Sequence, residues 1–395
     1  MGRNPAGLAA TVLVINMSDL GSGANCAWAR SAAKKGGAVH ASGAGPSHPY
    51  RGLQPYQFWN RSISAVEPHL VDPVTNPRFT IGREARVATA GSCFAQHISR
   101  SISRSGYNYF VTEDGADLSE QDRTAGGYGI FPARFGNIYT TVQLLQLFEE
   151  AFGEREPAAQ ALQRPDGRYV DPLRQQVDAR GFDSPAAVRE DRAGHLACVR
   201  RMFAETDLFI FTLGLAEAWQ LRSDGTVFSS APGVVGGAYD PELHAFANFS
   251  LEETYGALRT FLEKFHRLNP DAKVLLTVSP VPLMATYEDR SVLSSTTLSK
   301  SVLRVAADMA IRDHAWVDYF PAYEIITASV TGGMYYEDDH RGINALGVAH
   351  AVRCFMANYT RDADRLDHAA MDLSVDPSAS QRVLCDEDIL AMARR

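Results

Sequence analysis

The fold of this chain is decided by the stretch Ala88-Thr89-Ala90-Gly91-Ser92-Cys93-Phe94-Ala95. Residues 86–90 form a short apolar run that ends at Gly91, a pattern typical of a buried strand. Residues 94–105 then carry apolar side chains at helical spacing. The sequence therefore predicts a strand–turn–helix junction with Ser92 at the turn.

Two roles are open for Ser92 at such a junction. In the first, the turn lifts its hydroxyl above the sheet, where backbone N–H groups at the start of the helix stabilise a negatively charged oxygen. In the second, Ser92 is simply the N-cap residue of the helix, a common position for serine. The local sequence does not decide between a chemical and a capping role.

Further along the chain, strand-like and helix-like segments alternate. Short apolar runs predict strands at Leu208–Leu213, Val274–Val278 and Trp316–Phe320. Helical spacing predicts helices over 251–268 and 299–311. This alternation indicates the α/β class, with a parallel sheet covered by helices on both faces. Ligands bind beyond the carboxyl ends of the strands in such folds.

Composition divides the 395 residues into a body and peripheral segments. Residues 1–47 are interpreted as a flexible leader, because the Gly-, Ala- and Ser-rich part of this range offers few large apolar side chains to bury. The folded body is expected over 48–360, with a polar insertion or lid around 153–200. Residues 361–395 are interpreted as a charged, peripheral tail.

Charge and motif content exclude several classes of function. A net charge of −8 with scattered basic residues gives no reason to expect nucleic acid. No apolar run approaches the ~18 residues of a membrane span, so we expect no integral membrane segment. Five widely spaced cysteines without a Cys-x-x-Cys pair indicate neither a disulfide framework nor a zinc site, and favour the cytoplasm. No phosphate-binding glycine loop is present, so we expect neither cofactor nor metal.

The residues Gly91-Ser92-Cys93-Phe94-Ala95 also match the motif that names the GSCFA family. Four further segments carry the resemblance, which runs from about His48 to Tyr359: Tyr128-Gly129 with Arg134–Thr140, Phe211–Trp219, Ser279–Leu283 and Tyr319–Glu324. The family resembles the SGNH/GDSL hydrolase superfamily. The resemblance implies a doubly wound, flavodoxin-like parallel sheet and a nucleophilic serine.

By this resemblance, Ser92 is the nucleophile. Cys93, directly after it, is assigned to the oxyanion region. It is a weaker alternative nucleophile, because free cysteine is among the most buried residue types. The second superfamily segment corresponds to Gly136 and Asn137, and the Asn137 amide either donates to an oxyanion or caps its own turn.

The third superfamily segment begins at Gly214, and its usual asparagine position is occupied by Ala216, which has no donor. Glu217 and Trp219 follow, as substrate contacts or as a structural carboxylate and a core aromatic. Two further pairs, Asp289-Arg290 and Ser299-Lys300, are candidate cleft residues if the loop after Pro282 covers the active site.

The last superfamily segment supplies an Asp-x-x-His pair. Its spacing, counted back from Gly347, places the acid at Asp339 and the histidine at Gly342, so the expected base is missing. A serine without a base loses nearly all activity. His340 is the first alternative, oriented by Glu337, Asp338 or Asp339. His350 and His97 rank lower, because helical spacing places them away from the expected position.

Two functions follow from the resemblance and from the positions at which this sequence departs from the superfamily pattern. The first is a serine-dependent ester hydrolase or O-acyltransferase acting on an acylated carbohydrate or another small hydroxylated compound. The second is a catalytically degenerate domain that binds a glycan or a partner protein, since Ala216 and Gly342 replace catalytic positions. Labelling of Ser92 by a fluorophosphonate distinguishes the two.

Overall fold

The computed structural model describes residues 48–361. The chain divides into two compact units, residues 1–53 and 54–395, and the fold described below is that of the second. The predicted leader (1–47) and all but the first residue of the predicted tail (361–395) lie outside the described residues.

The core of this unit is a parallel sheet in the order β1 (Val87–Gly91), β4 (Leu208–Leu213), β7 (Lys273–Val278) and β8 (Val317–Tyr319). Residues 108–110 extend the sheet beyond β1. There the Val87 N–H donates to the Asn108 carbonyl over 2.9 Å, and the Phe110 N–H donates to the Val87 carbonyl over 2.8 Å. With this edge segment, the sequence of neighbours is that of a flavodoxin-like doubly wound sheet.

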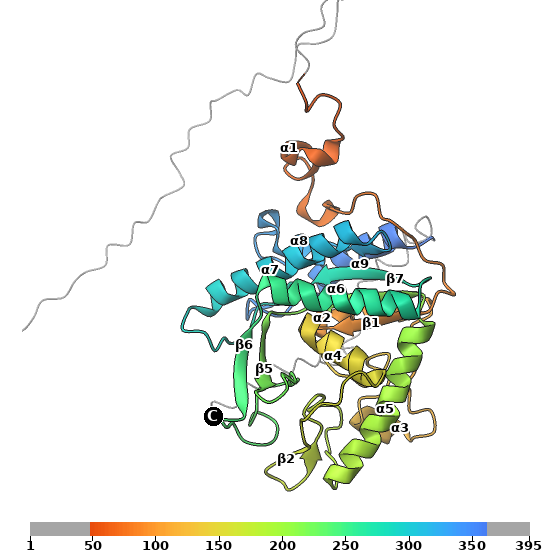
Figure 1. The fold of residues 1–395 in the computed structure, drawn as a ribbon. Coiled ribbons are helices and arrows are strands. Elements are labelled where there is room, and N and C mark those ends of the chain that lie inside the picture. The colour runs from red at the N-terminus through yellow and green to blue at the C-terminus, as the bar shows by residue number, and fades with distance from the viewer. Residues whose placement is uncertain (1–47, 362–395) are drawn as a thin grey trace, which may run out of the picture. The chain divides into compact units, whose positions relative to one another are not determined.

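Helices cover both faces of the sheet (Figure 1). One face packs against α4 (Thr141–Ala151), α5 (Pro185–Glu205), α6 (Leu251–Leu268) and α7 (Val292–Asp313). The other packs against α2 (Cys93–Arg104), α8 (Ala322–Thr327) and α9 (Ala345–Tyr359). Along β4 the side chains alternate between these two cores, as the pleat requires. The predicted α/β class and doubly wound sheet are confirmed.

Helix α7 shows where sequence periodicity falls short. The apolar spacing predicts its start at Ser299, whereas the helix begins at Val292. Val292, Leu293 and Leu298 are exposed in its first two turns. The buried residue in these turns is Ser295, which is polar, so no apolar periodic signal marks them.

The predicted insertion around 153–200 contains a two-stranded antiparallel ribbon, β2 (Leu162–Gln163) and β3 (Tyr169–Val170). It also contains most of α5, and Val199 near the end of that helix belongs to the main core. The range therefore joins a peripheral ribbon to most of a core helix.

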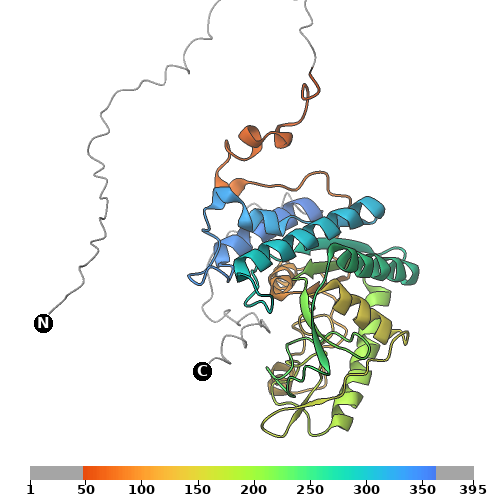
Figure 2. The same ribbon diagram turned by 60° about the vertical axis from the view of Figure 1, so that its left-hand side comes forward.

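A second antiparallel pair, β5 (Glu217–Leu221) and β6 (His244–Asn248), follows the carboxyl end of β4. Figures 1 and 2 show this hairpin extending away from the central sheet. The remaining short elements are α1 (Trp59–Ser62), α3 (Glu120–Ala125) and 3-10 turns at Pro55–Gln57, Pro68–Leu70 and Ser329–Thr331. Across residues 48–361, no helix is both long enough and apolar enough to cross a membrane.

Candidate active site

The turn between β1 and α2 is built around a glycine that no other residue can replace without strain. Gly91 has φ +131°, and a Cβ added to it would lie 2.3 Å from the Thr212 carbonyl oxygen of the neighbouring strand. The Ser92 N–H donates to the same carbonyl over 3.3 Å. This close approach of two backbones holds Ser92 at the carboxyl end of the sheet, directly before α2.

Ser92 occupies the N-cap position of α2 but makes no side-chain cap. Five other helices do have an N-cap side chain that accepts a backbone N–H: α3, α4, α5, α6 and α9. Ser92 is 3% exposed, and its hydroxyl makes no hydrogen bond to any described residue. The capping role left open by the sequence is therefore not performed. Cys93 is the first residue of α2.

Two threonine hydroxyls at the same end of the sheet are also buried without a hydrogen-bond partner among the described residues. Thr212 and Thr277 lie beside Gly91 in the register of β1, β4 and β7. Buried polar groups are usually paired, since leaving one unpaired costs about 1–3 kcal/mol. The carboxyl end of the sheet thus carries a small group of unused hydroxyls.

The segment of Gly136 and Asn137 lies beside this turn. The Ile138 N–H donates to the Gly91 carbonyl over 2.9 Å, which attaches the segment to the end of β1. The Asn137 side chain is buried, and its Oδ1 accepts from Gln96 Nε2 of α2 at 3.5 Å. The structure therefore brings the second predicted segment to the first turn of the helix that begins at Ser92.

The third predicted segment, which begins at Gly214, is hydrogen-bonded to the second. The Gly214 and Leu215 N–H groups donate to the Tyr139 carbonyl over 2.9 and 3.1 Å. From α7, Lys300 Nζ donates to the Gly214 carbonyl over 2.5 Å, and Ser299 Oγ accepts the Ala216 N–H over 2.8 Å.

Lys300 is 2% exposed, so a buried ammonium group fixes the loop in which Ala216 replaces the usual asparagine. The sequence carried a signal for this burial. Lys300 lies on the buried stripe of α7, three and seven residues before Leu303 and Ala307.

The fourth predicted segment forms a hairpin, residues 336–343, whose turn uses its own polar groups. The Glu337 N–H donates to the Gly342 carbonyl over 2.7 Å, closing the turn. Asp339 Oδ1 accepts the Arg341 and Gly342 N–H groups, each over 2.8 Å. These backbone hydrogen bonds lower the pKa of Asp339. His340 is exposed, with φ +54°, at the tip of the turn.

The hairpin is attached to the carboxyl end of β7. Tyr336 donates its hydroxyl to the Pro280 carbonyl over 3.3 Å, and Arg341 Nε donates to the Pro282 carbonyl over 3.2 Å. Because the Ser92 hydroxyl has no hydrogen-bond partner among the described residues, neither His340 nor Asp339 is paired with it in this structure.

The two other histidines differ in environment. His350 is buried, with Nδ1 2.8 Å from the Tyr335 hydroxyl and Nε2 2.8 Å from the Val71 carbonyl, so both ring nitrogens have structural partners. Burial, with a smaller effect of Arg100, lowers the pKa of His97 to about 4.

Glu217, at the start of β5, lies at the edge of a cavity of about 260 Å³. Its side chain is nearly buried, and Oε1 accepts the Thr286 hydroxyl over 2.9 Å. Burial raises the pKa of this carboxyl. Trp219 lines the same cavity.

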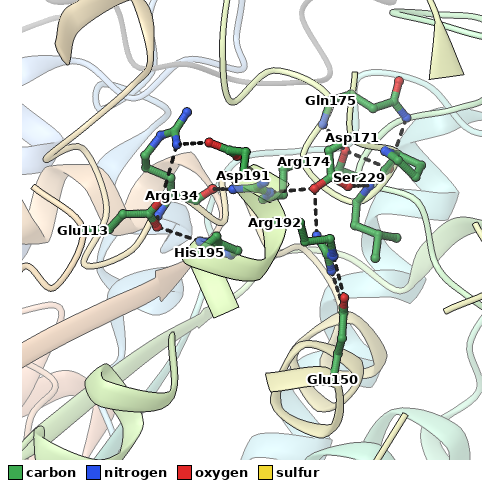
Figure 3. A network of polar contacts seen from close by, with 12 residues as sticks. Glu113, Arg134, Glu150, Asp171, Arg174, Gln175, Asp191, Arg192, His195 and Ser229 are labelled. Atoms are coloured by element: carbon green, nitrogen blue, oxygen red, sulfur yellow. Dashed lines mark hydrogen bonds and ion pairs between the residues drawn. The ribbon is translucent and has the colours of Figure 1, made fainter. Parts of the chain in front are cut away.

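Sequence reasoning missed a buried network of charged side chains next to the second segment (Figure 3). Arg134 Nη1 lies 2.9 Å from Asp191 Oδ1, and Arg174 Nη2 lies 2.6 Å from Asp191 Oδ2. Arg174 also pairs with Asp171, and Arg192 joins Asp171 to Glu150.

A histidine extends this network towards the edge of the sheet. His195 Nδ1 lies 2.7 Å from Glu113 Oε2. Burial lowers the pKa of His195 to about 4, so the neutral ring donates this hydrogen bond at neutral pH. Because Arg134 is two residues before Gly136, the network holds the second segment against α5. The abundance of Arg and Asp in 153–200, interpreted from sequence as a polar insertion or lid, was the available signal.

Fold and site together define a doubly wound α/β protein with a serine at the turn between its first strand and the following helix. The chain belongs to the GSCFA family, whose model matches residues 86–355. No curated protein matches it. A solved structure from Parabacteroides merdae, described as a candidate GDSL-like lipase, is similar at 13% identity, with 72% of this chain and 99% of that chain covered. The TM-score of the two structures is 0.31.

Metal ligands are not grouped in the part of the chain that the structure describes. Within residues 48–361, no cluster of three or more His, Cys, Asp or Glu side chains is arranged to hold a metal ion.

Proposed function

We propose that Ser92 is the nucleophile of an ester hydrolase or O-acyltransferase that acts on an acylated carbohydrate or another small hydroxylated compound. The observation that carries this proposal is the state of the Ser92 hydroxyl. It stands at the amino end of α2, is buried, and neither caps the helix nor bonds to any described residue. A buried hydroxyl without a structural task is expected where a ligand supplies the partner.

In the proposed reaction, Ser92 Oγ attacks the carbonyl carbon of the ester while its proton passes to a base. The carbonyl oxygen becomes an oxyanion, which the first N–H groups of α2 face with the positive end of the helix dipole. The Asn137 amide and the Gly136 backbone are the further proposed donors. The alcohol then leaves with the proton, and water or an acceptor hydroxyl releases the acyl group from Ser92.

We assign the base to His340, with Asp339 or a neighbouring carboxylate as its partner. Ser92 is only 3% exposed and unpaired in this structure, so the proposal includes a rearrangement when substrate enters. The hairpin 336–343, joined to the end of β7 through Tyr336 and Arg341, is the segment that we expect to move.

A second candidate function rests on two observations. Ala216 has no donor at the usual asparagine position, and Asp339 is already used by the turn that it caps. Both are consistent with a domain that retains the cleft for binding a glycan or partner protein but does not turn over an ester.

We also propose how the chain is divided into segments. We infer a leader over 1–47, a GSCFA/SGNH-like body over 48–360 and a charged tail over 361–395. The acidic net charge supports the proposal that the protein has no nucleic-acid partner. The five cysteines are widely spaced without a Cys-x-x-Cys pair, which supports the proposal of a cytoplasmic location.

Labelling with a fluorophosphonate, followed by mass spectrometry of the modified peptide, tests the proposed function. Labelling of Ser92 is expected, because an activated serine attacks the probe whereas an ordinary hydroxyl does not. Ser99→Ala is the matched control: Ser99 is a buried serine of the same helix that bonds to the Gln96 carbonyl, and its loss should leave labelling intact. A folded wild-type sample that stays unlabelled would favour the binding domain.

A further inference from the structure

The cavity of about 260 Å³ adjoins the candidate active site without belonging to its reacting groups. It lies between the β5–β6 hairpin and the segment that follows β7, and Tyr139 and Leu215 form part of its wall. These two residues are joined by the hydrogen bond from the Leu215 N–H to the Tyr139 carbonyl. One wall of the cavity is thus the same pair of segments that lies beside Ser92.

Three aromatic rings from separate segments form another wall. Trp219 of β5 pairs with Phe246 of β6 across the hairpin, with ring centroids 5.7 Å apart. Tyr287, from the segment after β7, lies 4.8 Å from Trp219 and 5.4 Å from Phe246. All three line the cavity, and Tyr287 is 63% exposed at its edge.

Glu217 supplies the charge of this cavity. Two residues before Trp219 on β5, it lies on the same face of the hairpin, and it is the one charged side chain among the described residues that line the cavity. Burial raises the pKa of Glu217 and the charge of Arg290 opposes this rise, but the Arg290 guanidinium pairs with Glu288 over 3.0 Å. A nearly buried carboxylate is usually accompanied by a cation of its own, and here the cation that acts on Glu217 is engaged by a second carboxylate.

The remaining polar groups of the wall are mostly occupied by the protein itself. Gln143 accepts the Tyr139 and Thr140 N–H groups and donates to the Phe228 carbonyl. Ser229 Oγ accepts the Gln175 N–H over 3.1 Å.

The Ser230 hydroxyl is different, because it is buried without a hydrogen bond to any described residue. A ligand with many hydroxyls would find few partners in this wall. A wholly apolar ligand would leave the Glu217 carboxylate desolvated and unpaired.

We propose that this cavity binds the ammonium group of a small amino alcohol, quaternary or protonated, against the faces of Trp219 and Tyr287 and beside the Glu217 carboxylate. Aromatic faces attract cations within about 6 Å of the ring centre, and a carboxylate completes the charge balance. The Ser230 hydroxyl is available to the oxygen of the same ligand. The proposed binding does not require that Ser92 catalyses a reaction. The further step, that the cavity selects esters of amino alcohols as substrates, rests on the proposed function of Ser92.

The ionisation of Glu217 agrees with this arrangement. Burial raises the pKa of its carboxyl, and this outweighs the opposing effects of the Thr286 hydroxyl and of Arg290. An ammonium group in the cavity would stabilise the ionised form.

Isothermal titration calorimetry with two ligands of nearly equal shape tests the proposal. Choline carries the positive charge, and 3,3-dimethylbutan-1-ol replaces its nitrogen by carbon. We expect choline to bind at least tenfold more tightly to the full chain. Glu217→Gln keeps an acceptor for Thr286 but removes the charge, and should abolish that preference. Glu288→Gln is the matched control, because Glu288 bonds to Asn248 and Arg290 instead of lining the cavity.

Equal binding of the two ligands, or no binding of choline up to 10 mM, would overturn the proposal. A preference for choline that survives in Glu217→Gln would also overturn it. If thermal unfolding shows that Glu217→Gln is misfolded, Trp219→Leu serves as the second variant. Repeating the titration with Ser92→Ala separates the two proposals. Choline binding in both chains without hydrolysis of acetylcholine by the wild type would retain the cavity as a binding site and reject it as a substrate site, whereas an unlabelled Ser92 would reject the hydrolase.

Discussion

The β1–α2 turn and the 336–343 hairpin both carry residues assigned to the proposed reaction, but they are held in opposite ways. The turn depends on distant partners: the carbonyl of Thr212 receives the Ser92 N–H, and Ile138 donates to the Gly91 carbonyl. The tip of the hairpin is held by its own residues, since Asp339 caps the N–H groups two and three residues further on.

Exposure follows the same division. Ser92 is buried, and its hydroxyl is unused by any described residue, whereas His340 is exposed at the tip of its turn. The sheet therefore determines where Ser92, the proposed nucleophile, lies, whereas the position of His340, the proposed base, depends on a local turn. Four predictions test this comparison, beginning with the largest effect.

Ser92→Ala should reduce turnover of p-nitrophenyl acetate by about 10³-fold or more, the usual loss for a nucleophile. The melting temperature should stay nearly unchanged or rise slightly, because the variant removes a buried hydroxyl that has no hydrogen bond among the described residues. Steady-state rates and thermal unfolding measure the two effects. Retained activity would remove Ser92 from the mechanism and with it the contrast between the two regions.

His340→Asn should reduce kcat/KM by about 10²-fold or more, the typical contribution of a general base. The loss should be accompanied by disappearance of the acid limb that a histidine base produces in the pH profile of kcat/KM.

His97→Asn and His350→Asn are the controls for this profile. His350→Asn should lower stability, since both ring nitrogens have buried partners, and leave the profile intact. If all three variants keep wild-type rates, histidine is not the base, and Gly342→His becomes informative. A Cβ at Gly342 would lie 3.1 Å from the Glu337 Cγ, a side chain that can shift.

Gly91→Ala should lower the free energy of unfolding by more than about 2 kcal/mol, because φ +131° is unfavourable for alanine and its Cβ would meet the Thr212 backbone. Urea unfolding measures this loss. Ala90→Gly, at the preceding residue of the same strand, should cost about 1 kcal/mol, the ordinary penalty for a glycine in an element interior. Equal effects at the two positions would show that the turn is not held by its approach to β4.

Deletion of residues 1–47 should have the smallest effect. The composition of this range predicts that it adds little to the core, so the free energy of unfolding should change by less than about 0.5 kcal/mol and activity should be kept. Urea unfolding and p-nitrophenyl acetate turnover check the result. A large loss of either would contradict the interpretation of this range as a leader.

Local pattern was sufficient for the main elements of the fold. The predicted strands agree with β1, β4, β7 and β8 to within about one residue at each end, and the helix predicted over 251–268 is α6. The strands are short continuous apolar runs, as expected for strands buried on both faces, and α6 repeats apolar side chains with the helical period. Both patterns are visible without knowledge of the partner.

The candidate site was only partly visible in this way. The motif at Ser92 and the resemblance pointed to the segments at Gly136 and Gly214, which the structure brings together at the carboxyl ends of β1 and β4. The unused state of the Ser92 hydroxyl was not predictable, because a serine before a helix has the same local sequence whether or not it caps.

By itself, then, the sequence determined the α/β class, the strand–turn–helix junction at Ser92 and the family of the chain. Tertiary structure alone decided that Lys300 holds the Gly214 loop, that Asp339 closes its own turn, and that Glu217 faces an aromatic wall. The reason is physical: strand and helix periods are properties of neighbours along the chain, whereas burial, ion pairing and cavities depend on residues that folding brings together from far apart.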